Sequence, residues 1–239
     1  VSSASSASFK AITTKTGGLS VTATTINLAG AVKTDELTDS GSATFLGAVV
    51  LGANVSIDSD NTGSDGSVSF SSTVNADNAA TQNRTLTINV GSGNVTFGGA
   101  VGGTQALADL DVTATTTNVN ANVTVDDQGG NTLAWSGAVV LGASVTFDFN
   151  GATDNSINFS GTINADNSTT ANRTLVVDAD TGTATFGGSI GAGTNGALAD
   201  FDVTAATINL NGATIQVDDQ PLVAASEIRF TGAVVLGAN

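Results

Sequence analysis

The first residues that suggest chemistry are acidic side chains in a short polar segment. Asp58, Asp60 and Asp65 lie within eight positions, separated by Ser, Asn, Thr and Gly. Hard cations such as Ca²⁺ bind several oxygens from a tight acidic turn. However, the fifth position is Thr62, no Glu closes the loop, and the similar segment 148–154 has lost part of the acidic set. We therefore expect a solvated turn and no cofactor, with calcium bound by these three residues as the alternative.

An acidic pair also occurs twice, at Asp126-Asp127 and at Asp218-Asp219. Two neighbouring carboxylates bind a cation jointly only in a turn, because adjacent residues of a strand point to opposite faces. Gly129-Gly130 and Pro221 follow the pairs and favour turns. We interpret both pairs as solvated corners.

The best repeated charged set combines an aspartate with an arginine seven positions later. Asp77 precedes Arg84, and Asp166 precedes Arg173. An arginine in a chain with so few cations is able to anchor a sugar or a carboxylate. The simpler interpretation is an ion pair that closes a protruding loop, a contact worth at most ~1 kcal/mol when exposed.

Composition restricts catalysis. The chain has no His, Cys, Tyr or Met, so Ser-His-Asp and Cys-His sets are impossible. Composition leaves acid–base chemistry by two carboxylates open. An active site is usually unique, whereas nearly every polar cluster here is duplicated. We expect that the protein is not an enzyme.

Net charge limits the partners. Six Lys and Arg face 21 Asp and Glu, for a net charge of −15. Nucleic-acid and anionic lipid surfaces need clustered cations, which the chain lacks. No apolar run approaches the ~20 residues of a membrane-spanning helix, so we expect no membrane insertion. The acidity itself keeps the chain soluble.

These residues belong to a long internal repeat. FLGAVVLGANVSID begins at Phe45, WSGAVVLGASVTFD at Trp135 and FTGAVVLGAN at Phe230. Other equivalent positions are 89 apart at first and 91 apart later, and the extra residues fall in Gly-, Asn- or Pro-containing stretches. We divide the chain into a partial repeat (1–44), two full repeats (45–134 and 135–229) and the start of another (230–239). All four belong to one continuous domain, 1–239. We expect the functional protein to be longer than this sequence.

The elements between the turns read as short strands. Apolar residues alternate with small or polar ones, and Gly, Asn and Asp separate the segments. In-phase repetition favours an all-β fold, a parallel β-helix (β-solenoid) of about ten rungs with 20–25 residues each; tandem β-sandwiches are the alternative. Phe45, Phe70 and Phe97 are expected to stack as an internal ladder. The residues to which we assign a structural role are Phe45, Phe70, Phe97, Trp135, Phe159, Phe186, Phe230, Arg84 and Arg173.

Several phrases resemble a known type of repeat. They are TGAVVLGAN (231–239), GNVTFGGAVGG (93–103), ALADLDVTA (106–114) and ATINLNG (206–212). They are similar to the β-strand repeats of large bacterial surface proteins, the filamentous-haemagglutinin-like and autotransporter-passenger adhesins. The resemblance implies export, a right-handed β-helix, and a role as adhesin, biofilm fibre or stalk. It carries over no catalytic residue.

We therefore predict an extracellular structural segment at a bacterial cell surface: a rigid spacer in a fibre or adhesin stalk, serving adhesion or a biofilm matrix. One alternative is a self-assembling filament subunit, whose partner is another copy of the repeat or chain, end to end. The other is an adhesin that binds a glycan or host surface through loops such as 58–66 and 77–84.

Overall fold

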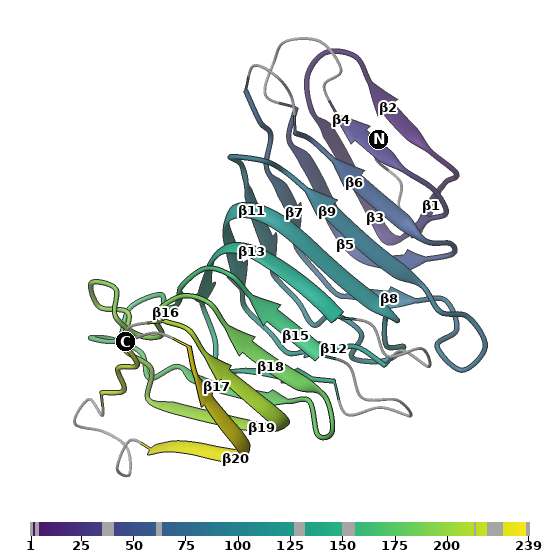
Figure 1. Cartoon of the computed structure of the whole chain (residues 1–239). Coiled ribbons are helices and arrows are strands. Elements are labelled where there is room, and N and C mark those ends of the chain that lie inside the picture. Colours follow the sequence, from purple (N-terminus) through teal and green to yellow (C-terminus); the bar gives the residue numbers. More distant parts are fainter. Residues whose placement is uncertain are drawn as a thin grey trace.

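The protein is a parallel β-solenoid in a computed structural model (Figure 1). The structure describes residues 2, 5–34, 41–60, 64–126, 132–149, 156–212, 214–218 and 227–237. Within these ranges all regular elements are strands, every strand pairing is parallel, and no helix is long and apolar enough to cross a membrane. Successive turns stack from the N-terminal to the C-terminal end (Figure 1).

Each turn contributes one segment to each of three sides of the solenoid, called faces A, B and C in chain order. Face A contains β7 (Val68–Phe70), β10 (Asn94–Phe97) and β16 (Ile163–Ala165). Face B contains β1 (Ser6–Phe9), β8 (Val74–Ala76), β12 (Val123–Thr124), β14 (Val145–Asp148) and β17 (Thr174–Asp178). Face C contains β2 (Ile12–Thr14), β4 (Val32–Thr34), β6 (Val55–Asp58), β9 (Thr85–Asn89), β15 (Ser156–Phe159) and β18 (Thr183–Phe186).

Six longer strands bend around a corner and belong to two faces. β3 (Leu19–Leu28) and β5 (Ala43–Leu51) run from face A to face B. β11 (Asp109–Val119) and β13 (Thr132–Leu141) run from C to A, and β19 (Asp200–Leu210) and β20 (Glu227–Leu236) from B to C. Each of the three corners is therefore turned by one pair of long strands.

Parallel registration runs unbroken along every face. On face C, ten residues lie in register from the first turn to the last: Ile12, Val32, Ile57, Ile88, Val112, Trp135, Phe159, Phe186, Leu210 and Leu236. Face B has a matching ten-residue column: Ala7, Ile26, Val49, Val74, Val101, Val123, Phe147, Val177, Val203 and Phe230. The described chain thus forms about eight turns, or ten strand layers when the incomplete first and last turns are included.

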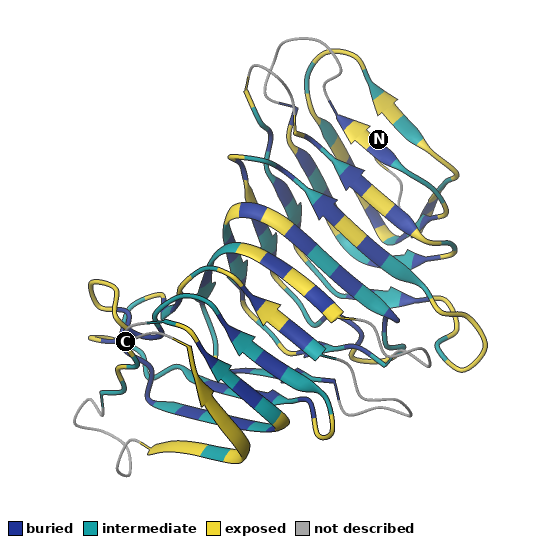
Figure 2. Ribbon diagram, viewed as in Figure 1, coloured by how far each residue is buried: buried dark blue, intermediate teal, exposed yellow. Residues whose placement is uncertain are grey.

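The expected parallel β-helix is confirmed, and the tandem β-sandwich alternative is wrong. A sandwich requires antiparallel pairing, whereas every pairing here is parallel. Period-two alternation explains the core: in most strands the inward side chains are buried and their neighbours are intermediate or exposed, which appears as alternating bands in Figure 2.

The three corners share one local structure. Gly47, Gly137 and Gly232 have positive φ angles of 152°, 88° and 137°. At each, two residues of the preceding turn lie opposite the single glycine, which is a β-bulge. A methyl group on these glycines would lie 1.8, 1.9 and 1.7 Å from a backbone oxygen of that turn. Only glycine fits such a corner.

The sequence repeat is not a whole number of turns. Phe45 lies on face A, Trp135 on face C and Phe230 on face B. From each of these residues to the next, the chain advances three turns and two further faces, eleven faces in all. Equivalent residues of successive units therefore move by one face around the solenoid. The two units share this advance although their lengths differ, because the extra residues lie in loops.

Candidate functional site

The aromatic side chains form the interior feature that best matches the sequence expectations. Phe45, Phe70 and Phe97 are fully buried on face A, with centroid separations of 5.2 and 5.5 Å and interplanar angles of 12° and 3°. Phe97 then contacts Trp135 at 6.0 Å, and the contacts continue through Phe159 and beyond. The remaining rings of this line are Phe186, Phe201 and Phe230. Phe147 packs beside Trp135 and Phe159, and Phe149 packs against Phe147.

Trp135 is where the line of rings crosses from face A to face C. Its indole is buried, and Nε1 donates a hydrogen bond to the Leu110 carbonyl at 3.0 Å. A buried Trp needs such an acceptor for its N–H group. The bond fixes the ring between Phe97 and Phe159, so the aromatic contacts stay continuous across the junction of the two units.

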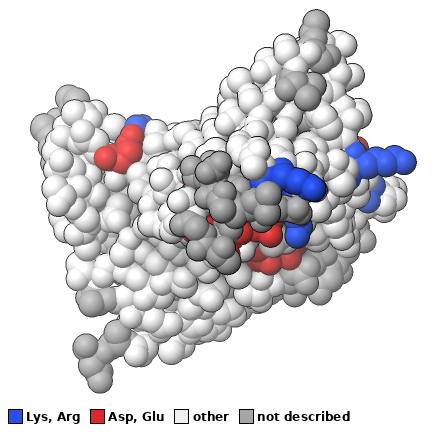
Figure 3. Space-filling model, turned by 90° about the horizontal axis from the view of Figure 1, so that it is seen from above, with Lys and Arg blue, Asp and Glu red and all other residues white. Residues whose placement is uncertain are grey.

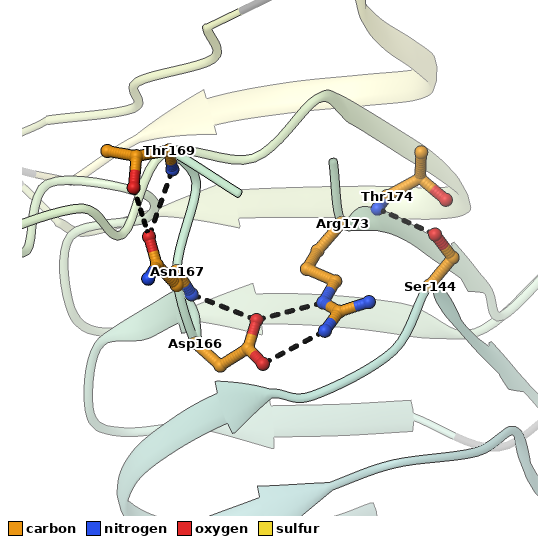
Figure 4. Close-up of polar contacts among 6 residues, drawn as sticks. All are labelled: Ser144, Asp166, Asn167, Thr169, Arg173 and Thr174. Carbon is orange, nitrogen blue, oxygen red and sulfur yellow. Dashed lines mark hydrogen bonds and ion pairs between the residues drawn. The ribbon is translucent and has the colours of Figure 1, made fainter. Parts of the chain in front are cut away.

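The two Asp–Arg sets each close a loop. Nε and a terminal nitrogen of Arg84 donate to the two carboxylate oxygens of Asp77, both at 2.8 Å. In the second unit Arg173 makes the same bidentate contact with Asp166, at 2.8 and 2.9 Å (Figure 4). Each aspartate also accepts a hydrogen bond from the backbone N–H of the following asparagine, at 2.9 Å. Both loops therefore have the same internal structure.

Electrostatics at the two loops follows from these contacts. The hydrogen bonds from Arg84 hold the pKa of Asp77 below its usual value, and those from Arg173 do the same for Asp166. The arginine pKa values are raised in return. The aspartate side chains remain 35% and 37% exposed, so water screens both pairs. Both arginines already make a bidentate contact within their own loops, which favours loop closure over capture of an external carboxylate.

The eleven-face advance places these loops at different corners. The first loop leaves β8 on face B and enters β9 on face C. The second leaves β16 on face A and enters β17 on face B. The same structure therefore faces two directions around the axis.

The three residues of the expected calcium turn each accept a hydrogen bond, and the carboxylates of Asp60 and Asp65 both lie beside Gly91. Asp65 accepts hydrogen bonds from the Ser92 N–H and hydroxyl, at 2.6 and 2.7 Å, and Asp60 accepts one from Asn89 at 3.0 Å. Asp58 accepts the Asp60 N–H at 3.2 Å. Within the described ranges no cluster of three or more His, Cys, Asp or Glu side chains is suited to a metal. Residues 61–63 lie outside these ranges, and calcium here stays a prediction.

The duplicated acidic pairs are only partly described. Asp126 and Asp218 each donate a backbone hydrogen bond to the preceding turn, to Leu107 at 2.8 Å and Leu198 at 2.9 Å. Asp127 and Asp219 lie outside the described residues. The main chain of the first aspartate in each pair is therefore fixed by a hydrogen bond to the neighbouring turn.

Charged side chains are sparse on the visible surface. On the side seen in Figure 3 they form a few small patches, and most of that surface is uncharged.

Comparisons with known proteins assign the chain to no family. No family model, curated protein or solved structure matches it. Any function must therefore be argued from the solenoid itself.

The role of the corner glycines was not predicted from the sequence. Gly47, Gly137 and Gly232 occupy the same place in all three copies of the GAVVL phrase. That recurrence was the available signal, because a glycine kept before four apolar residues indicates a special backbone conformation.

Proposed function

We propose that the protein is a structural segment of an extracellular fibre or adhesin stalk on a bacterial surface, acting as a rigid spacer. The observation that carries the proposal is the unbroken register of ten strand layers that the described residues of both sequence units form. Each added turn contributes about 4.8 Å to such a stack. A repeat of this kind therefore converts sequence length directly into rod length.

The duplicated features of the molecule also support a spacer. Buried rings, corner glycines and Asp–Arg loops recur along the chain, and each has a structural partner: the rings and ion pairs within their own unit, the glycines in the backbone of the preceding unit. None of these features places a nucleophile beside a general base, one arrangement that catalysis uses. We propose no reaction for the described residues.

The mechanical claim is tested by adding units. Copies of residues 45–134 inserted after position 134 should lengthen the particle by about 18 Å each, since eleven faces correspond to three and two-thirds turns of ~4.8 Å. Small-angle scattering or electron microscopy of chains with one, two and three insertions measures the increment. Particles that grow in width, or that behave as beads on a flexible string, would contradict a spacer.

The proposed location needs a separate test. Antibodies against the segment should label intact cells of the source organism, and brief protease treatment of those cells should remove the signal. Labelling that appears only after permeabilisation would exclude a surface fibre while leaving the rod itself unaffected.

A filament subunit, in which another copy of the chain would pack on β20, is the second candidate. Ile228, Val234 and Leu236 are 41%, 43% and 75% exposed on the outermost described strand. A strand edge with this composition is able to accept a further parallel strand, from the same chain or from another copy. Light scattering across a concentration series distinguishes a filament subunit from a spacer segment, since particles of a filament subunit must become larger as the concentration rises.

A further inference from the structure

The second unit contains a polar hollow beside its Asp–Arg loop. The hollow has a volume of about 150 Å³ and is lined by Ser168, Thr169, Asn195, Gln216 and Asp218, with two glycines and Ala197 completing its wall. An apolar cavity of about this size holds one benzene molecule. The space is therefore suited to a single six-membered ring.

The hollow coincides with a difference between the two units. In the first unit the side chain of Gln105 crosses to the loop, and its Oε1 accepts the Ala79 N–H at 2.8 Å. The second unit has two extra residues in this region, and backbone takes the place of the glutamine side chain. The Asn195 carbonyl accepts the Ser168 N–H at 2.7 Å. Asn195 adopts a left-handed conformation with φ of 56° to do this. A main-chain contact has thus replaced the side-chain contact.

Ser168 distinguishes the hollow from an ordinary surface depression. It replaces Ala79 of the first unit and is only 6% exposed, yet its hydroxyl makes no hydrogen bond to any of the described residues. Its Oγ atom is not among the fully buried polar atoms that lack a partner, so it is accessible from the hollow that Ser168 lines. Its neighbour Thr169 is engaged with Asn167, to which its hydroxyl donates at 2.6 Å (Figure 4). Ser168 therefore offers an accessible hydroxyl, not engaged by the described residues, to a ligand in the hollow.

We propose that this hollow binds one neutral sugar ring, a hexopyranose or its N-acetyl derivative. The amides of Asn195 and Gln216 both donate and accept, and the Asp218 carboxylate accepts from hydroxyl groups. This mixture matches the adjacent hydroxyls of a pyranose. A carboxylate in the wall and a net charge of −15 disfavour anionic sugars. A single carboxylate is a poor ligand set for Ca²⁺, which prefers several oxygens of high charge.

The proposal is independent of the spacer role, because a rod serves as a spacer with or without a ligand. The wall contains no aromatic side chain on which a sugar would stack. A ligand of about twelve heavy atoms held only by hydrogen bonds at an open site binds weakly, with Kd on the order of 1 mM.

The test is a two-dimensional amide NMR titration of the full 239-residue chain. Glucose, galactose and N-acetylglucosamine are each added to about 100 times the expected Kd. At least one should give saturable shifts centred on the amides of Ser168, Asn195 and Gln216. Ser168→Val and Gln216→Ala should each weaken that binding about tenfold, one lost hydrogen bond apiece. Ala79→Val, at the equivalent position of the first unit, should leave it unchanged.

Several outcomes would overturn the proposal. Absence of saturable shifts with all three sugars would do so, as would binding that persists equally in Ser168→Val and Gln216→Ala. Glucuronate binding as tightly as glucose would remove the charge argument. Shifts of the same amides with CaCl₂ and not with sugars would identify a cation site instead. Gln216 is exposed, so its variant stays informative if the Ser168 variant fails to fold.

Discussion

At the scale of single residues, the corner glycines carry the strictest requirement in the fold. Gly137 combines a φ of 88° with a backbone oxygen 1.9 Å from the position of a Cβ atom. Side chains nearby are able to move aside, but a carbonyl held in the ladder of the preceding turn is not. The requirement recurs at Gly47 and Gly232, on the other two corners.

Gly137→Ala is therefore expected to destabilise the protein by roughly 2–4 kcal/mol, through backbone strain and displacement of the preceding turn. Gly52→Ala is the matched control. Its methyl group would meet Ala29 Cβ at 3.7 Å and the Leu28 carbonyl oxygen at 3.8 Å, both ordinary contacts. Urea unfolding followed by circular dichroism measures both. Equal midpoints for the two variants would refute the role assigned to the corner glycines.

The Asp–Arg loops predict a specific pH dependence. Because the folded-state pKa of Asp166 is lowered by Arg173, the pair adds stability above the unfolded value of about 3.9, and this contribution disappears as pH falls through the folded value. Arg173→Ala should raise the Asp166 pKa toward normal and cost at most ~1 kcal/mol near pH 7, since the pair is partly exposed.

Carboxyl ¹³C titration of wild type and Arg173→Ala measures the shift directly. Asp77 serves as the internal control, because its own partner Arg84 is untouched and its titration should not move. An unchanged Asp166 titration in the variant would show that the ion pair does not hold the loop in solution.

Of the features at single residues, some could be predicted from the sequence and others could not. The Asp–Arg contact was predictable because the same seven-residue spacing occurs twice and the chain offers few other cations. The Ser168 hollow was not predictable. It depends on how two inserted residues route the backbone, and an alignment shows an insertion without showing the space that it leaves.

At the scale of elements, the strands are held by columns of like residues. β5, β7 and β10 stack Phe45, Phe70 and Phe97 with nearly parallel rings. The spacings of 25 and 27 residues each correspond to one turn, which is why the sequence predicted this ladder. Its continuation through Trp135 was not foreseen, because 38 residues do not make a whole number of turns. The rings meet there across two faces.

Phe70 lies in the middle of this ladder and is 1% exposed. Phe70→Ala should cost about 3–5 kcal/mol, because it removes a buried ring and leaves a cavity between two others. Leu46→Ala, on the outer side of β5 and 42% exposed, should change stability by less than ~0.5 kcal/mol. Thermal and urea unfolding compare the two. A small loss for Phe70→Ala would mean that the ladder is not packed as described.

At the scale of the whole molecule, the parallel solenoid was predictable from in-phase repetition, but the path of the repeat around it was not. Sequence alignment gives the number of residues between equivalent positions, whereas the structure gives the number of solenoid faces between them. The two units differ in length yet advance by the same eleven faces, since loops absorb the extra residues. After three units the pattern returns to its starting face, so surface features face three directions along a longer rod.

Distances between spin labels test this arrangement most directly. Thr81 and Thr170 lie in the equivalent Asp–Arg loops, at the corner between faces B and C and the corner between A and B. Their axial separation is about 18 Å, and the change of corner adds one side of the solenoid, for an expected distance above about 25 Å. Thr81 and Thr181 are the control pair, since both lie at the B–C corner about four turns apart, or ~19 Å along the axis.

Pulsed electron paramagnetic resonance on the two double-cysteine variants gives both distances in solution. We expect a clearly longer distance between Thr81 and Thr170 than between Thr81 and Thr181. Equal distances, or a shorter one for the equivalent loops, would place the two units on the same side of the rod and contradict the eleven-face repeat.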